Sequence, residues 1–141
     1  MSSYILVGGG KRDKRWWNDL VRACAQVGDT FEIHCWYDER SEIALARRFG
    51  QVIESGWHGG MVIRGRITRD FLNFLLELEK PADIDIYNKM TPFFTIQFGD
   101  RLYSEHYGTE MTIDRSVEDR RGVIGRILTE MESYGTVHRD L

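Results

Sequence analysis

The chain has 141 residues, of which 42% are hydrophobic and 29% are charged, so it is long enough to bury a core as one domain over residues 1–141. A formal net charge of −3 argues against a protein that coats nucleic acid through bulk electrostatics. No apolar run approaches the roughly 20 residues that a membrane span needs, and no signal-peptide pattern opens the chain. We therefore expect no membrane partner and no nucleic-acid partner.

Two cysteines support an intracellular assignment. Cys24 falls on the apolar stripe of an expected helix, and Cys35 falls inside an expected strand. Two buried free thiols in an otherwise ordinary domain are typical of a reducing compartment. The sequence therefore predicts a cytoplasmic protein.

Strands and helices alternate through the first half of the chain. A short apolar run predicts a strand over Tyr4–Val7, and apolar residues at helical spacing predict a helix over Trp16–Val27. Strict alternation predicts a second strand over Phe31–Tyr37. A helix over Ser41–Phe49 and a strand over Gln51–Glu54 follow. This β-α-β-α-β order favours a parallel sheet with right-handed crossovers.

The second half is less regular. Thr68 is placed to cap a helix that ends before Pro81, and a fourth strand is expected over Ala82–Tyr87. Ser116 and Asp119 have the spacing of a capping box, so we expect the last helix to open there.

An antiparallel hairpin is expected over Thr91–Tyr107, with Gly99-Asp100 as a two-residue turn. In this register the facing pairs are Ile96 with Tyr103 and Phe98 with Arg101. The sequence thus predicts an α/β fold: a single three-layer domain with a mostly parallel sheet, a C-terminal antiparallel hairpin and a final helix.

A glycine-rich loop follows the first expected strand. Gly8, Gly9 and Gly10 run directly into Lys11 and Arg12. Backbone N–H groups of such a loop can hold an anion at the carboxyl end of a strand. The loop fits neither the P-loop nor the dinucleotide fingerprint, and a plain turn with a solvated basic tip is the simpler interpretation.

Two further loops carry chemically useful side chains. Trp57 and His58 lie among three glycines after the third expected strand, and His58 is a candidate general acid or base. Asp38 and Glu39 follow the second strand, where either carboxylate could hold a ribose hydroxyl or pair with His58. Favourable interaction with the dipole of the next helix is the simpler role for these acids.

The three loops form one predicted site if the first three strands are parallel, because their carboxyl ends would then open on one edge. Trp36 and Trp57 would stack on a flat ring, the glycine loop with Lys11 and Arg12 would bind negative charge, and the catalytic candidates are His58, Asp38 and Glu39. The expected ligand is a nucleotide-like or phosphorylated small molecule.

Catalysis and cofactor remain open in the sequence. Hydrolysis or group transfer at a phosphate or glycosidic bond is the class that these residues favour, but no complete catalytic constellation occurs. No cofactor is identified, and no Cys–His pattern with metal spacing occurs, so no metal site is predicted.

Two alternatives compete with this interpretation. A non-catalytic inhibitor, immunity or regulatory module would act through the aromatic hairpin, for example as a homodimer. A local nucleic-acid binder would use the arginines of the last helix, although acidic residues are interspersed among them: Arg115, Arg120, Arg121 and Arg126.

Overall fold

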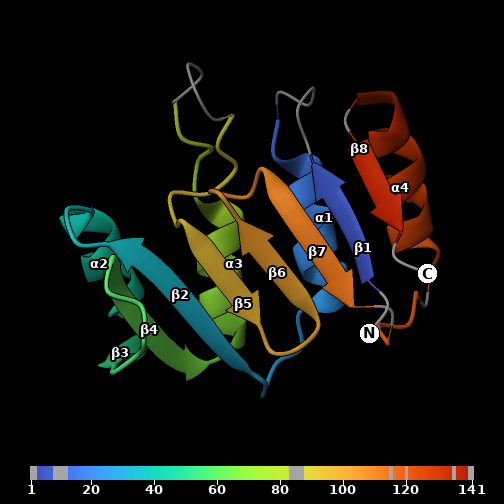
Figure 1. Ribbon diagram of the computed structural model, residues 1–141. Helices are drawn as coiled ribbons and strands as arrows, with labels where there is room; N and C mark the ends of the chain where they lie inside the picture. Colours follow the sequence, from blue (N-terminus) through green and yellow to red (C-terminus); the bar gives the residue numbers. More distant parts are fainter. Residues whose placement is uncertain are drawn as a thin grey trace.

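The computed structural model of the chain describes residues 3–7, 13–82, 88–114, 116–119, 121–134 and 136–139. In this part of the chain, eight strands form one sheet in the order β3-β4-β2-β5-β6-β7-β1-β8 (Figure 1). The strands are β1 (Ser3–Val7), β2 (Thr30–Trp36), β3 (Gly50–Ile53), β4 (Gly60–Arg66), β5 (Thr95–Phe98), β6 (Leu102–Glu105), β7 (Glu110–Asp114) and β8 (Thr136–Arg139). The helices are α1 (Arg15–Cys24), α2 (Arg40–Ala46), α3 (Arg69–Glu77) and α4 (Val123–Tyr134).

The predicted mostly parallel, three-layer sheet is wrong. Every pair of neighbouring strands in the described sheet is antiparallel. The first three strands do point in one direction, but β4 lies between β2 and β3, and β5, β6 and β7 lie between β2 and β1. Strands that come later in the chain therefore occupy the positions that a parallel neighbour would take.

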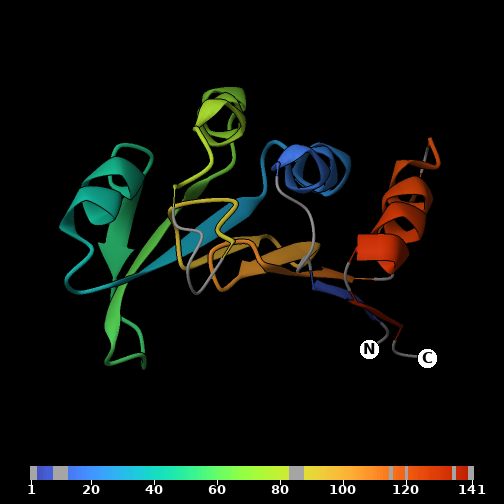
Figure 2. The ribbon, with the colours of Figure 1, turned by 90° about the horizontal axis from the view of Figure 1, so that it is seen from above.

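The helices cover only one face of this sheet, so the domain has two layers (Figure 2). The core lies between them and is built from alternate strand residues and the inner faces of α1, α3 and α4. Near its centre the indole N–H of Trp17 donates to the hydroxyl oxygen of Ser104 at 3.1 Å, and neither residue is exposed to solvent. The opposite face of the sheet carries no helix in the described part of the chain (Figure 2).

Most local predictions of the first half are confirmed. The expected helices and strands coincide with α1, β2, α2 and β3 within a few residues. Thr68 caps α3, since its hydroxyl oxygen accepts the backbone N–H of Phe71 at 3.1 Å. The sequence interpretation missed β4, β7 and β8. Most of the strand expected over Ala82–Tyr87 lies outside the described residues.

The hairpin of β5 and β6 is confirmed, but its predicted register is wrong by one residue. Ile96 lies opposite Ser104, and Phe98 lies opposite Leu102. The connection has three residues, Gly99 to Arg101, with Gly99 at φ 56°. One extra turn residue moves the whole of β6 by one position, so Ser104 faces the core and Tyr103 faces the uncovered side.

The last helix begins later than the capping-box spacing predicts. It starts at Val123, and Asp119 caps it through two backbone bonds rather than lying inside it. The Asp119 carboxylate accepts the N–H groups of Ile124 and Gly125, both at 2.9 Å. The segment before α4 is therefore a loop fixed against the start of the helix, where it faces α1.

Candidate functional site

Four of the residues predicted to form a site meet at the end of β2. Trp36 is its last residue, Asp38 and Glu39 form the turn into α2, and Trp57 lies in the loop between β3 and β4. Gly8, Gly9, Gly10, Lys11 and Arg12 lie outside the described residues. The strand that leads to them, β1, is four positions from β2 in the sheet, or roughly 19 Å at the usual strand spacing.

Aromatic rings gather on the uncovered face beside this turn. Trp36 packs against Trp57 and Phe94 with ring centroids 4.9 and 4.8 Å apart. Tyr107 joins through Phe94 at 5.3 Å, and His34 stacks on Trp57 at 5.6 Å. Residues from both halves of the chain thus form a continuous aromatic cluster.

A hollow of about 490 Å³ opens beside these rings. We call it the aromatic cleft; its lining is Trp36, Tyr37, Asp38, Glu39, Gly59 and Tyr107. Gly59 is needed because a Cβ atom there would lie 2.6 Å from the ring of Trp36 and 3.0 Å from the indole nitrogen of Trp57. The glycine therefore permits the close approach of the two indoles.

Glu39 is the fixed carboxylate of the aromatic cleft. The backbone N–H of Trp36 donates to its Oε1 at 2.8 Å, and the hydroxyl of Tyr107 donates to its Oε2 at 2.9 Å. Both donors are neutral, so they orient the carboxylate without cancelling its charge. On the ring of Tyr107, the Nζ of Lys89 lies 4.0 Å from the centroid.

A strained turn positions Tyr107. His106 and Tyr107 have φ values of 52° and 62°, in the left-handed region that favours glycine and asparagine. Gly108 follows at φ 81°, and its N–H donates to the carbonyl of Glu105 at 3.1 Å. Such strain costs on the order of 1–3 kcal/mol per residue and clusters at functional sites. The sequence signal for this turn is weak, because His is only moderately enriched in the left-handed region and Tyr is not.

His58 lies apart from the carboxylates. Its side chain is exposed and does not line the aromatic cleft. Among the described residues, no hydrogen bond or ion pair joins it to Asp38 or Glu39. The structure therefore brings Trp36, Trp57 and Glu39 together and leaves His58 as a separate predicted residue.

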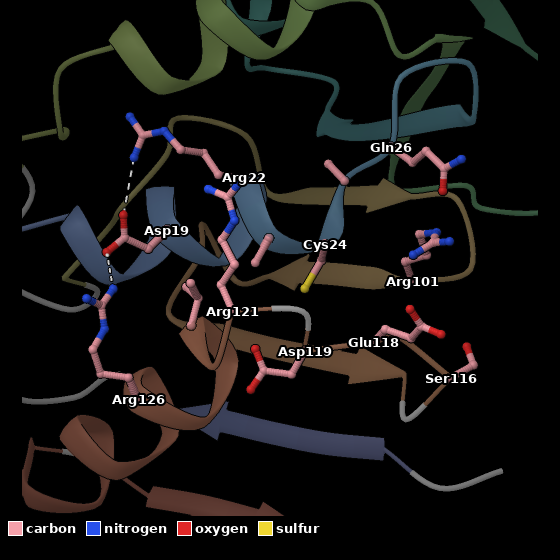
Figure 3. Close-up of a pocket in the computed structure, with 13 residues that line it drawn as sticks. Asp19, Arg22, Cys24, Gln26, Arg101, Ser116, Glu118, Asp119, Arg121 and Arg126 are labelled. Atoms are coloured by element: carbon pink, nitrogen blue, oxygen red, sulfur yellow. Dashed lines mark hydrogen bonds and ion pairs between the residues drawn. The ribbon is translucent and has the colours of Figure 1, made fainter.

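A larger hollow than the aromatic cleft lies between α1 and α4, with a volume of about 740 Å³ (Figure 3). We call it the arginine cleft, because the guanidinium groups on its walls outnumber the carboxylates. Its charged lining residues are Arg22, Arg101, Arg121, Arg126, Asp19, Glu118 and Asp119. The sequence interpretation noted Arg121 and Arg126 but had no signal that would bring Arg22 and Arg101 beside them.

The arginines differ in how far they are paired. Arg22 and Arg126 share the carboxylate of Asp19 at 3.2 and 3.6 Å. Arg101 lies 3.6 Å from a carboxylate oxygen of Asp29. Arg121 has no partner in the part of the chain that the structure describes, and Figure 3 shows it reaching from the start of α4 toward Arg22 on α1. Guanidinium groups and carboxylates are balanced around the cleft once Asp29 is counted, and Arg121 is the arginine left to meet an anion.

Two other lining groups, the thiol of Cys24 and the carboxylate of Asp119, are not set up for catalysis. Cys24 is buried, and burial raises the pKa of its thiol to about 12, more than the nearby Arg101 lowers it. The carboxylate of Asp119 already accepts two N–H groups of α4. Neither is placed to act as a nucleophile or base near neutral pH.

Comparison of the chain with protein-family models, curated proteins and solved structures gave no match. None of the helices in the described ranges has the length and apolar character needed to cross a membrane. The site must therefore be interpreted from its own geometry and charge.

Proposed function

We propose that this protein binds a phosphorylated small molecule in the arginine cleft. The observation that carries the proposal is the convergence of four guanidinium groups from α1, the β5–β6 turn and the start of α4 on one hollow. The planar donors of arginine match phosphate oxygens in pairs, which favours an anion of this geometry.

The size of the hollow supports a small organic ligand. At about 740 Å³ it falls within the range of roughly 300–1,000 Å³ that is usual for ligand pockets. A nucleotide or sugar phosphate would fill more of it than a bare ion. We propose that the phosphate contacts Arg121, which has no partner in the described part of the chain, and Arg101, whose partner Asp29 lies outside the lining.

The lining favours binding over catalysis. Cys24 is held as the neutral thiol, and Asp119 is occupied by the backbone of α4. The proposed role is therefore that of a binding protein. The ligand class is the anionic one that the sequence predicts, but the proposed site is in a different part of the fold.

Isothermal titration with pyrophosphate, AMP and adenosine tests this proposal. We expect the two phosphates to bind and adenosine not to, with affinity falling as salt is added. Arg121→Gln and Arg101→Gln should each weaken phosphate binding about tenfold or more, because each removes charge-assisted hydrogen bonds.

Arg69→Gln is the matched control, since Arg69 is exposed at the start of α3 and outside the cleft. It removes the same charge and should leave the affinity within a factor of about two. Absence of binding by either phosphate, or equal weakening by Arg69→Gln and Arg121→Gln, would overturn the proposal.

A further inference from the structure

We propose that the aromatic cleft is a second site, which binds a quaternary ammonium group. It is separate from the arginine cleft and does not rest on the function proposed above. The inference begins with exposure: Trp36 and Tyr37 are 36% and 58% exposed, unusual values for side chains of their size. Both line a hollow to which Tyr107 also contributes.

The acidic side chains of the aromatic cleft favour a positively charged ligand. Asp38 and Glu39 both line it, and no Lys or Arg of the described chain forms an ion pair with either. The two hydrogen-bond donors of Glu39, a backbone N–H and a tyrosine hydroxyl, are both neutral. An anion would be repelled here, whereas a cation would be attracted both by the carboxylates and by the ring faces.

The rings of this cluster already attract a cation within the chain. The ammonium group of Lys89 lies 4.0 Å from the centre of Tyr107. Cation–π attraction is strongest for Trp and remains substantial for Tyr, which are the ring types that line the cleft. The same physical attraction is therefore available on the exposed ring of Trp36.

The geometry favours a quaternary ammonium over a primary amine or a guanidinium. Both oxygens of Glu39 already accept hydrogen bonds, and rings form much of the remaining wall. A quaternary ammonium needs no hydrogen-bond acceptor against these rings, whereas an ammonium or guanidinium must turn its N–H groups to the Asp38 carboxylate and away from the rings. Aromatic cages are the recurrent solution for such cations.

The cleft is also built in advance of any ligand. The left-handed residues His106 and Tyr107 place the Tyr107 hydroxyl on Glu39, and Gly59 lets Trp57 support Trp36 from behind. Because these groups are held by bonds and packing within the chain, little ordering would accompany binding. The strain at His106 and Tyr107 is then part of the cost of holding the cleft in this shape.

Titration of tryptophan fluorescence with choline and with 3,3-dimethylbutan-1-ol, its uncharged carbon isostere, tests the proposal. We expect choline to bind at least about tenfold more tightly than the isostere, the difference that a desolvated cation–π contact gives. Trimethyllysine amide and lysine amide form a second pair, which distinguishes a modified side chain of a partner from a free small molecule.

Substitutions of residues that line the aromatic cleft test whether choline binds there. Trp36→Ala should abolish the choline response, Trp36→Phe should restore part of it, and Glu39→Gln should remove the preference for choline over its isostere. Tyr103→Ala is the control, because Tyr103 lies on the same uncovered face but outside the cleft. Circular dichroism and the unfolding midpoint show that each variant is folded.

Three results would overturn the proposal: equal binding of choline and the isostere, no response to choline, or equal loss with Tyr103→Ala and Trp36→Ala. A dimer in sedimentation equilibrium that dissociates in Trp36→Ala would also overturn it, since a second copy would then cover the rings.

Discussion

The two clefts lie at opposite ends of the central strands of one sheet, and they differ in almost every respect. The arginine cleft is at the end where β5 turns into β6. The aromatic cleft is at the opposite end, where β2 and β6 finish. The seven residues of β2 separate these ends by roughly 20 Å. One hollow is lined by arginines and carboxylates together, whereas the charged residues that line the other are both acidic.

The clefts also differ in how they are held. Surface ion pairs and a capped helix shape the arginine cleft, and exposed ion pairs contribute little to stability. Packed rings, a partly buried hydrogen bond from the Tyr107 hydroxyl and a strained turn shape the aromatic cleft. We infer that the first cleft adjusts to its ligand, whereas the second is rigid before binding.

The largest expected effect comes from Gly60, where β4 meets the end of β2. A Cβ atom at this position would overlap the backbone carbonyl oxygen of Cys35, so Gly60→Ala must push β4 away from β2. We expect the free energy of unfolding in urea to fall by about 3 kcal/mol. Choline binding should be lost with it, while pyrophosphate binding to the folded protein persists.

Gly56→Ala is the control for this substitution, because nothing lies within 4 Å of the added carbon. Equal destabilisation by the two variants would show that the contact between β2 and β4 does not support the aromatic end.

A substitution in the core should weaken the domain without favouring either cleft. Ser104→Ala leaves the buried indole N–H of Trp17 without its acceptor, which costs about 2 kcal/mol. Thermal and urea unfolding should both record the loss, and the affinities for pyrophosphate and choline should stay unchanged. Ser41→Ala, at an exposed position of α2, should have little effect. A selective loss of one ligand in Ser104→Ala would contradict the independence of the clefts.

Relief of strain should stabilise the aromatic end. His106→Gly removes a left-handed non-glycine residue and should raise the free energy of unfolding by about 1 kcal/mol. Part of the gain is offset by loss of the hydrogen bond between His106 and Glu110, and Glu110→Gln measures the contribution of that contact separately. If His106→Gly lowers the free energy of unfolding by more than Glu110→Gln does, the turn is not strained.

The last comparison is one of pH dependence and concerns the two thiols, one near each cleft. Burial raises the pKa of both Cys24 and Cys35 from 9.0 to about 12. The unfolded chain therefore loses these protons first, so stability is unaffected below about pH 9 and falls as the pH rises toward 12. Between pH 8.5 and 10.5, the unfolding free energy of the parent should fall more steeply than that of a Cys24→Ala, Cys35→Ala variant.

Reaction with a thiol reagent provides a second readout. Both cysteines should be unreactive in the folded protein at pH 8 and should react fully in denaturant. Rapid modification of Cys24 in the folded protein would mean that the arginines, rather than burial, control its pKa.

Local features were predictable from the sequence because their causes are local. Apolar spacing marked α1, the Thr68 side chain marked the start of α3, and alternation marked β2. Alternation also marks Glu110–Asp114, so β7 was within reach of the same reasoning. β4 was not predicted because glycines, which are depleted in strands, lie at and within it: Gly59, Gly60 and Gly65. The β-branched pair Val62-Ile63 is nevertheless a strand signal.

Strand partners were not predictable, because they depend on residues far away in the chain. The β-α-β order correctly implied that β1, β2 and β3 point in one direction, but nothing local shows that antiparallel strands fill the spaces between them. The hairpin register depended on whether Arg101 belongs to the turn or to β6, and that single residue decided which face Tyr103 occupies.

The same distinction applies to the sites. Trp36, Asp38 and Glu39 are neighbours in sequence, and their proximity to Trp57 follows from the pairing of β2 with β4. Tyr107 reaches Glu39 only because a left-handed turn points it there. The arginine cleft joins residues from both ends of the chain, so only the three-dimensional fold could show it.

The separation of the two clefts is tested most directly by amide and side-chain NMR shifts of one labelled sample titrated with pyrophosphate and then with choline. We predict that pyrophosphate moves the signals of Arg101, Arg121 and Gly125, and that choline then moves the indole signals of Trp36 and Trp57 without reversing the first set. Overlapping sets of shifted residues, or choline shifts confined to the arginine cleft, would contradict the account.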